Sequence, residues 1–212
     1  MKNFNIFCLL LIILLATKIH TQTTYKVIDL GNYGGISTTG WDINDNTVIV
    51  GEVRPSPTVF EKALMWKNGA VTELGNLANG ERSIAYGINN LEQVVGVSST
   101  SGLDTNRAFL WVNGNMDELA SLGGRYSAAL DVNNLGQIVG HAEIDLGTVF
   151  KRRPCLWEGS SVINLETLGG DDGAAYAIND LGTIVGRSSD GSETMKAFRW
   201  KNGSMIDLGT LG

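Results

Sequence analysis

Residues 107–116 read Arg-Ala-Phe-Leu-Trp-Val-Asn-Gly-Asn-Met, a short apolar run that contains a tryptophan and leads into an Asn-Gly pair. Asn-Gly between apolar runs is the strongest short-range signal for a β-hairpin, because a type I′ turn needs positive φ at both central residues. The pattern recurs along the chain, with its tryptophan at Trp66, Trp111, Trp157 and Trp200, which are spaced by 45, 46 and 43 residues. The sequence therefore repeats a hairpin with a period of about 45 residues.

A second motif follows the same period. An Asn after an apolar residue recurs, and a Gly that closes a β-branched run follows each Asn seven residues later. The pairs are Asn44 and Gly51, Asn89 and Gly96, Asn133 and Gly140, and Asn179 and Gly186. Asn favours tight turns because its side chain bonds its own main chain two residues on, and β-branched runs favour strands. Each unit is thus a supersecondary element that cannot bury its apolar face alone.

Four short strands per unit, without a convincing helical pattern, are typical of a β-propeller blade. We therefore expect an all-β fold, a β-propeller-like array of four four-stranded repeats at 25–71, 72–116, 117–162 and 163–205. Residues 206–212 then supply the first strand of a fifth unit. Small residues in the second strand, as in Ser127-Ala128-Ala129, indicate crowding near a ring axis. A parallel β-helix is the weaker alternative, because its coils are shorter and need no hairpins.

The strand that opens each unit occurs once more than the other strands, which leaves two interpretations of the ring. The last strand could complete a blade by exchanging edges with residues 25–30. Alternatively, the chain is a piece of a longer ring, the interpretation that we favour. An incomplete ring would expose an open strand edge, through which the protein could self-associate.

These motifs also carry a family resemblance. The run at 107–116, the Asp-Leu-Gly-x-Leu-Gly-Gly type of unit opening and the Gly-Ile-Asn-Asn…Val-Val-Gly pattern resemble the extracellular HAF-repeat family, over residues 25–212. The resemblance implies export and a repeated β scaffold, and it supplies no catalytic residue. The His that gives the family its name is replaced here by Lys62, Arg107, Arg153 and Lys196, so no role of an imidazole transfers.

The N-terminus predicts export. Residues 1–21 combine Lys2 with an apolar run over 6–16, which suits a secretory signal peptide and is too short to span a bilayer; an uncleaved N-terminal anchor is the alternative. The repeat domain is then 22–212, extracellular or at the cell surface, with the periplasm as a further location. The whole chain has a net charge of −6, which disfavours nucleic acid as a partner. Cys155 is the one cysteine after residue 21, so we expect no intramolecular disulfide.

Residues that suggest chemistry have plainer explanations. The four in-phase tryptophans could form a ligand ring, but their phase favours packing between blades. The Asn turns offer too few carboxylates for calcium. His141 lies in a strand, Asp171-Asp172 lies in a glycine-rich loop where acids are ordinarily solvated, and Cys155 sits where other units have Phe or Leu. We therefore predict no catalytic residue, no metal site and no cofactor.

The connection between the third and fourth strands varies most from unit to unit. It covers Arg54–Glu61, Ser99–Asn106, Glu143–Arg152 and Ser189–Thr194, and equivalent loops of stacked repeats project from one face. Variable loops on a rigid scaffold commonly bind ligands. We predict a non-enzymatic binding module for an extracellular glycan or protein; the alternatives are an extracellular propeller hydrolase or lyase that uses loop carboxylates, and a structural surface-array component. The candidate ligand-binding residues are Arg54, Phe60, Phe150, Lys151 and Arg152.

Overall fold

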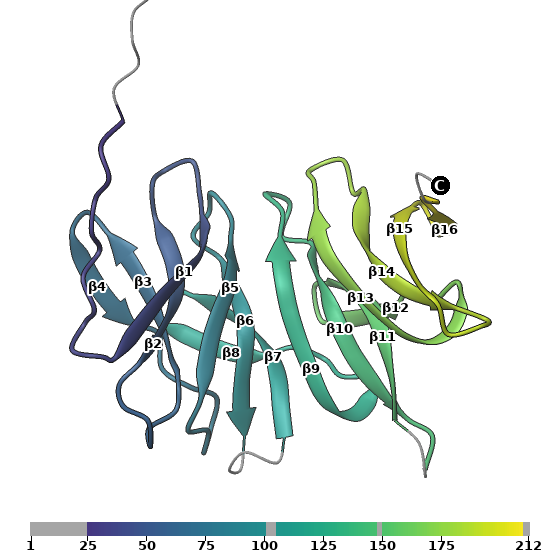
Figure 1. Ribbon diagram of the computed structural model, residues 1–212, viewed down its shortest axis with the longest axis horizontal. Helices are drawn as coiled ribbons and strands as arrows, with labels where there is room; N and C mark the ends of the chain where they lie inside the picture. Colours follow the sequence, from purple (N-terminus) through teal and green to yellow (C-terminus); the bar gives the residue numbers. More distant parts are fainter. Residues whose placement is uncertain (1–24, 101–104, 148–149, 210–212) are drawn as a thin grey trace, which may run out of the picture.

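The computed structural model describes residues 25–100, 105–147 and 150–209, and these residues form an all-β molecule. Their 16 strands make four blades of four strands each, which fan out side by side (Figure 1). Blade 1 is β1 (Ser37–Ile43), β2 (Ile49–Arg54), β3 (Lys62–Lys67) and β4 (Ala70–Glu73), and blade 2 is β5 (Ser83–Ile88), β6 (Val94–Thr100), β7 (Thr105–Val112) and β8 (Asn115–Glu118). Blade 3 is β9 (Gly123–Val132), β10 (Ile138–Asp145), β11 (Phe150–Glu158) and β12 (Ser161–Asn164), and blade 4 is β13 (Gly169–Ile178), β14 (Ile184–Asp190), β15 (Met195–Lys201) and β16 (Ser204–Asp207).

Every blade is an antiparallel meander, in which each strand pairs with the next one along the chain. The predicted propeller-like fold is confirmed. The predicted leader at 1–21 lies outside the described residues. The described residues contain no helix with the length and apolarity that a membrane crossing needs.

The blades are offset by one strand from the sequence units. The Asn-Gly hairpin joins the third and fourth strands of one blade, as in the pairing of Trp111 with Met116, so the strand that opens each sequence unit is the outer strand of the preceding blade. Ser204–Asp207 accordingly completes blade 4 as β16. The first copy of this strand, residues 27–30, is not in a strand. It lacks a blade to join among the described residues.

The main cores lie between the blades, where three of the four in-phase tryptophans pack. Trp111 packs against Met65 and Leu74 of blade 1, and Trp157, which is 1% exposed, packs against Leu119 of blade 2. Trp157 Nε1 also donates a hydrogen bond to the Ala120 carbonyl at 2.7 Å. The predicted packing between blades is therefore confirmed for Trp111, Trp157 and Trp200. It is not met by Trp66, which clusters with residues of its own blade because no blade lies beyond blade 1 among the described residues. Each buried aromatic ring removes roughly 150–250 Å² from water.

The in-phase Asn residues join neighbouring blades at one end of the molecule. In each turn the Asn side-chain oxygen accepts a main-chain N–H four residues on, as between Val48 and Asn44 at 2.9 Å. The side-chain Nδ2 donates to the carbonyl of the next Asn, from Asn44 to Asn89, from Asn89 to Asn133 and from Asn133 to Asn179, at 3.0, 2.9 and 3.1 Å. The predicted turn role is confirmed, and a continuous ladder across the blades adds to it.

The in-phase glycines allow two strands of a blade to approach closely. A Cβ atom on Gly96 would lie 2.0 Å from the Ile84 carbonyl oxygen and 2.8 Å from the Phe109 ring. A β-bulge in the innermost strand lies opposite, because the register shifts between Ala85 and Gly87. The extra residue of this bulge is Tyr86, and the bulges of the other blades place Trp41, Leu130 and Tyr176 at equivalent positions.

The outward faces of blades 1 and 4 lack a neighbouring blade among the described residues. A leucine recurs at the end of each copy of the outer strand, and its exposure shows where a neighbouring blade covers it. The three internal copies are at most 7% exposed: Leu74, Leu119 and Leu165. The two terminal copies, Leu30 and Leu208, are 40% and 54% exposed. The array is thus open at both ends, as Figure 1 shows.

Candidate ligand-binding site

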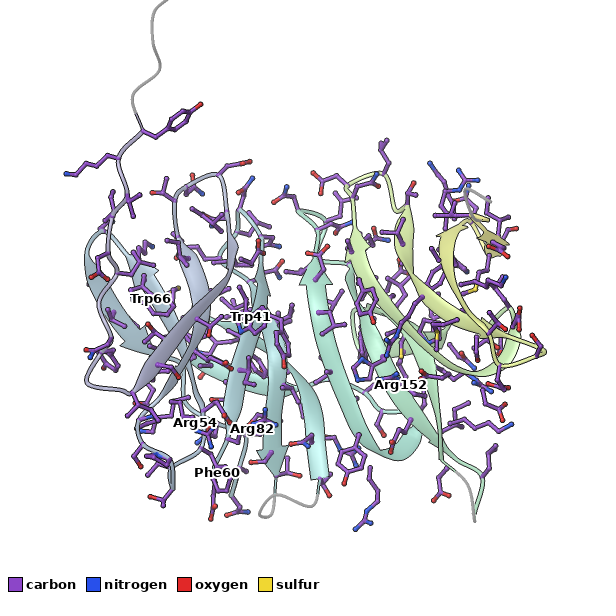
Figure 2. The ribbon with its side chains drawn as sticks, in the orientation of Figure 1. Trp41, Arg54, Phe60, Trp66, Arg82 and Arg152 are labelled. Carbon is purple, nitrogen blue, oxygen red and sulfur yellow. The ribbon has the colours of Figure 1, made fainter. Side chains whose placement is uncertain are left out.

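The connections between the second and third strands of the blades lie at the end of the molecule opposite the Asn ladder (Figure 1). At this end a pocket of about 340 Å³ opens between blades 1 and 2. Its lining residues are Arg54, Phe60, Glu61, Arg82 and Asn106. Figure 2 shows Arg54, Phe60 and Arg82 grouped there. Two of the predicted ligand-binding residues, Arg54 and Phe60, are therefore brought together.

The framework fixes the charged side chains of this pocket. Arg54 ends β2, Glu61 immediately precedes β3, and Arg82 immediately precedes β5. Arg82 Nε donates to Glu61 Oε2 at 2.9 Å across the junction between the blades, whereas Arg54 Nη1 lies 3.8 Å from Glu61 Oε1. The Arg54 side chain is 47% exposed, so its guanidinium still has N–H donors free for a ligand.

Aromatic residues of the innermost strands lie next to these charges. The rings of Trp41 and Tyr86 meet edge to face, with centroids 5.6 Å apart. Burial is the main cause of the raised pKa of Tyr86. The charges of Arg82, Glu52 and Glu61 also act on its hydroxyl. Trp41 is 51% exposed, so one tryptophan outside the repeat phase presents an indole to solvent.

Two carboxylates in this region have pKa values shifted in opposite directions. Burial, and secondarily the charge of Glu61, raises the pKa of Glu52, while Arg82 and the Trp41 indole oppose the shift. Glu52 Oε2 is buried without a hydrogen-bond partner among the described residues. Burial also acts to raise the pKa of Glu61, but hydrogen bonds from its own main chain and from Arg82 lower it overall.

We call Glu52, Glu61 and Arg82 the blade 1–2 cluster. Arginine supplies planar, bidentate donors for carboxylate and for vicinal hydroxyl or carbonyl oxygens, and exposed indole and phenol rings supply flat apolar faces. A charged pocket beside such faces suits a polar ligand with one apolar face, such as a sugar ring or a peptide side chain.

The other predicted ligand-binding residues lie elsewhere on this end of the molecule, at the junction of blades 3 and 4. Lys151 pairs with Asp171, and Arg152 pairs with both carboxylate oxygens of Asp172, at 2.6 and 2.7 Å. The main chain of Phe150 pairs with Asp145 at the start of β11, and its side chain lies outside the described residues. The five candidates thus do not form one site, because Arg54 and Phe60 lie between blades 1 and 2 whereas Arg152 lies at the junction of blades 3 and 4. Arg152 is also already paired with a protein carboxylate.

We call His141, Arg152, Asp172 and Arg187 the blade 3–4 cluster. Hydrogen bonds from Arg152 lower the pKa of Asp172 despite its partial burial. Burial, with the charge of Arg152, lowers the pKa of His141 to about 4, so the imidazole is neutral at pH 7. His141 Nδ1 is buried without a hydrogen-bond partner in the described part of the chain. The His141 imidazole is therefore a neutral, partly buried group beside fixed ion pairs.

Cys155 and the acidic residues complete the inventory of reactive groups. Cys155 is 0% exposed, which confirms the predicted buried position, and burial raises the pKa of its thiol. The expectation of solvated acids in a loop is wrong, because Asp171 and Asp172 lie in β13 and form ion pairs with basic residues of β11. Within residues 25–100, 105–147 and 150–209, no group of three or more His, Cys, Asp or Glu side chains is placed to hold a metal ion.

Sequence reasoning missed Arg82, Trp41 and Tyr86. Arg82 lies in the connection between blades rather than in the variable connection within a blade, and Trp41 is out of phase with the four framework tryptophans. A signal was nevertheless present, because Trp41, Tyr86, Leu130 and Tyr176 recur with spacings of 45, 44 and 46 residues. Three of these four bulge residues are aromatic.

Comparison with known proteins supports the fold. No protein-family model and no curated protein matches the chain. Among solved structures, it is similar to the β-propeller domain of the trilobed protease from Pyrococcus furiosus, with TM-score 0.56 and 12% identity over 82% of this chain and 52% of that one. It is also similar to TolB from Acinetobacter baumannii, with TM-score 0.55 and 12% identity over 78% of this chain and 42% of that one.

A third similar structure is the Pyrococcus horikoshii acylaminoacyl peptidase, with TM-score 0.52 and 13% identity over 82% of this chain and 27% of that one. The chain therefore spans between about a quarter and a half of the length of the structures that it matches. At 12–13% identity the likeness shows the fold alone, a β-propeller scaffold.

Proposed function

We propose that this protein is an exported, non-enzymatic binding module that captures an extracellular glycan or protein through the pocket between blades 1 and 2. The observation that carries the proposal is the pocket itself, in which the half-exposed Arg54 and the Phe60 ring lie beside an ion pair that is already complete, Glu61 with Arg82. The completed pair holds the pocket in shape, and Arg54 has hydrogen-bonding capacity to spare.

The aromatic pair extends this surface toward the innermost strands. Trp41 and Tyr86 are linked to the pocket through Glu52, whose carboxylate feels both the indole and the charges of Arg82 and Glu61. A sugar ring or a peptide aromatic could stack on the exposed indole while a polar group of the same ligand reaches Arg54. The rigid blades keep these groups in place before binding, which lowers the entropic cost of association.

An array of glycans and secreted proteins tests the proposal. The variant Arg54→Gln/Phe60→Ser should lose at least tenfold in affinity for every ligand that the wild-type protein captures. Its melting temperature should stay within about 3 °C of wild type, because Phe60 lies in a surface connection and Arg54 is half-exposed at the end of β2. Arg125→Gln is the matched control, since Arg125 is an exposed arginine of β9 outside the pocket. Equal capture by the wild type and by Arg54→Gln/Phe60→Ser would refute this site.

One observation favours a second function, extracellular hydrolysis. Glu52 and Glu61 are neighbouring carboxylates whose pKa values are pushed apart, the pattern of a general acid beside a carboxylate that stays ionised. Turnover on a panel of glycosides and esters would support this function if Glu52→Gln abolished turnover and left ligand capture intact. Turnover that survives Glu52→Gln would exclude Glu52 as the acid.

A further inference from the structure

A second concave site lies at the opposite end of the molecule from the pocket, between blades 3 and 4. This groove has a volume of about 610 Å³. Leu156 and Trp200 line it beside two exposed leucines, Leu135 and Leu181, and Glu158 and Asp180 contribute carboxylates. None of the residues that line it is Lys, Arg or His. The groove thus combines an apolar lining with uncompensated negative charge.

The junction between blades 1 and 2 shows what fills the equivalent place. There Lys67, from the end of β3, reaches across to Glu92 in the turn of the next blade, with its Nζ 2.7 Å from both carboxylate oxygens. Lys67 corresponds to Glu158 in blade 3, and Glu92 corresponds to Gly182 in blade 4. The cation is therefore replaced by an acid, and the acid is replaced by a residue without a side chain.

Both carboxylates of the groove are held in place by hydrogen bonds, and neither forms an ion pair within the described part of the chain. Glu158 Oε1 accepts a hydrogen bond from Gln137 Nε2 at 2.6 Å. Asp180 accepts hydrogen bonds from Asn134 Nδ2 and from the Asn134 main chain, and these lower its pKa, so it is ionised at neutral pH. The partially buried Trp200 ring lies within the same lining.

We propose that this groove binds a lysine or arginine side chain of a basic peptide segment in another protein. The charged head would pair with Glu158 or Asp180, and the methylene stem would lie along Trp200 and Leu181, as long cationic side chains commonly do over apolar surface. The bound side chain would fill the place that Lys67 fills at the first junction. The proposal concerns a different face from the pocket of Arg54 and Phe60, so either site can fail without the other.

Isothermal titration with an acetylated, amidated hexalysine peptide, at low and at high salt, tests the proposal. The wild-type protein should bind the peptide at low salt, with affinity reduced at least tenfold in 0.5 M salt because the charges are exposed. The variant Glu158→Lys/Gly182→Glu installs the ion pair of the first junction and should weaken binding at least tenfold. Its turn should tolerate the new side chain, because Glu92 already has φ +58 at a position where Gly182 has φ +69.

Two further variants separate groove binding from the general attraction of an acidic protein for a basic peptide. Glu81→Gln makes the same net charge change at the other end of the molecule, and it should bind like wild type. Lys67→Glu/Glu92→Gly should open a second groove between blades 1 and 2 and raise the stoichiometry toward two. Absence of binding by wild type, or equal weakening by Glu81→Gln and Glu158→Lys/Gly182→Glu, would overturn the proposal.

Discussion

The blade 1–2 cluster and the blade 3–4 cluster occupy equivalent positions but carry opposite charges. Glu61, which directly precedes β3 in blade 1, corresponds in the aligned repeats to Arg152 within β11 of blade 3. In the next blade of each pair, Arg82 of blade 2 directly precedes the small residue Ser83, and it corresponds to Asp172 of blade 4, which directly precedes Gly173. Each pair closes across its junction, with Arg82 Nε 2.9 Å from Glu61 and Arg152 Nε 2.6 Å from Asp172.

The junction between blades 2 and 3 has no charge at these positions, where Asn106 faces Tyr126 in a parallel bridge. The repeat framework therefore fixes where two side chains meet across a junction and leaves their chemistry free. The clusters differ in what remains after the pair has formed. At blades 1 and 2 the half-exposed Arg54 remains available, whereas at blades 3 and 4 Asp172 accepts both donors of Arg152 and draws Arg187 to 3.9 Å.

The largest difference between the clusters should appear in acid, because only the blade 3–4 cluster contains a His. The pKa of His141 is about 4 in the folded protein and near 6.5 when unfolded, so between these values the unfolded chain binds more protons and stability falls as pH falls. The loss should reach about 2–3 kcal/mol at pH 4, since a unit of pKa shift corresponds to about 1.4 kcal/mol and partial exposure reduces it.

The variant His141→Val isolates this effect, because Val97 occupies the equivalent position in blade 2. Denaturant unfolding at pH 7, 6, 5 and 4 should show a smaller loss in His141→Val than in wild type over that range. Glu52, whose raised pKa favours the folded state toward acid pH, is common to both proteins and cancels in the comparison. Identical pH profiles would show that the pKa of His141 is the same in the folded and the unfolded protein, and the lowered pKa would then be wrong.

A second comparison tests the ion pairs themselves. Arg152→Gln removes a bidentate pair and leaves Asp172 with the more distant Arg187, whereas Arg82→Gln removes one hydrogen bond and leaves Glu61 with Arg54 at 3.8 Å. We expect a loss of about 1–2 kcal/mol for Arg152→Gln and about 0.5–1 kcal/mol for Arg82→Gln, because both side chains are about a third exposed and solvent screens them. Urea unfolding at pH 7 measures both, and the reverse order would show that geometry does not govern these pairs.

The fold was largely predictable because the signals were local. Asn-Gly pairs and Asn turns each fix a hairpin or a tight turn from within a few residues, and four in-phase copies gave the propeller. The offset of one strand was not predictable in the same way. Whether the strand after an Asn-Gly turn belongs to the preceding or the following blade is decided by the longer connection, such as residues 74–82, that carries the chain across the junction.

The site was predictable only in part, since it depends on contacts between blades. Arg54 and Phe60 were accessible to sequence reasoning because they lie in the variable connection, but nothing local indicates that Arg82, about twenty residues later, would face Glu61. The same limit placed Arg152 among the ligand-binding candidates, because its partner Asp172 follows in the next blade. A comparison of charges at equivalent repeat positions would have suggested both pairs. Glu61 and Arg82 are an acid and a base there, and Arg152 and Asp172 are the reverse.

The smallest expected effect concerns Glu52, and it has the opposite sign. Burial, and secondarily Glu61, raises the pKa of Glu52, so its ionised form destabilises the folded state at pH 7. Glu52→Gln should stabilise the protein by about 0.5 kcal/mol, because the neutral amide avoids the burial of a charge and the repulsion from Glu61. Thermal unfolding at pH 7 and pH 4 measures this. The gain should vanish at pH 4, where the carboxyl is largely protonated and resembles the amide. A loss of stability at pH 7 would instead show that Glu52 is a second counter-ion of Arg82. The charges of the blade 1–2 cluster would then be as fully paired as those of the blade 3–4 cluster.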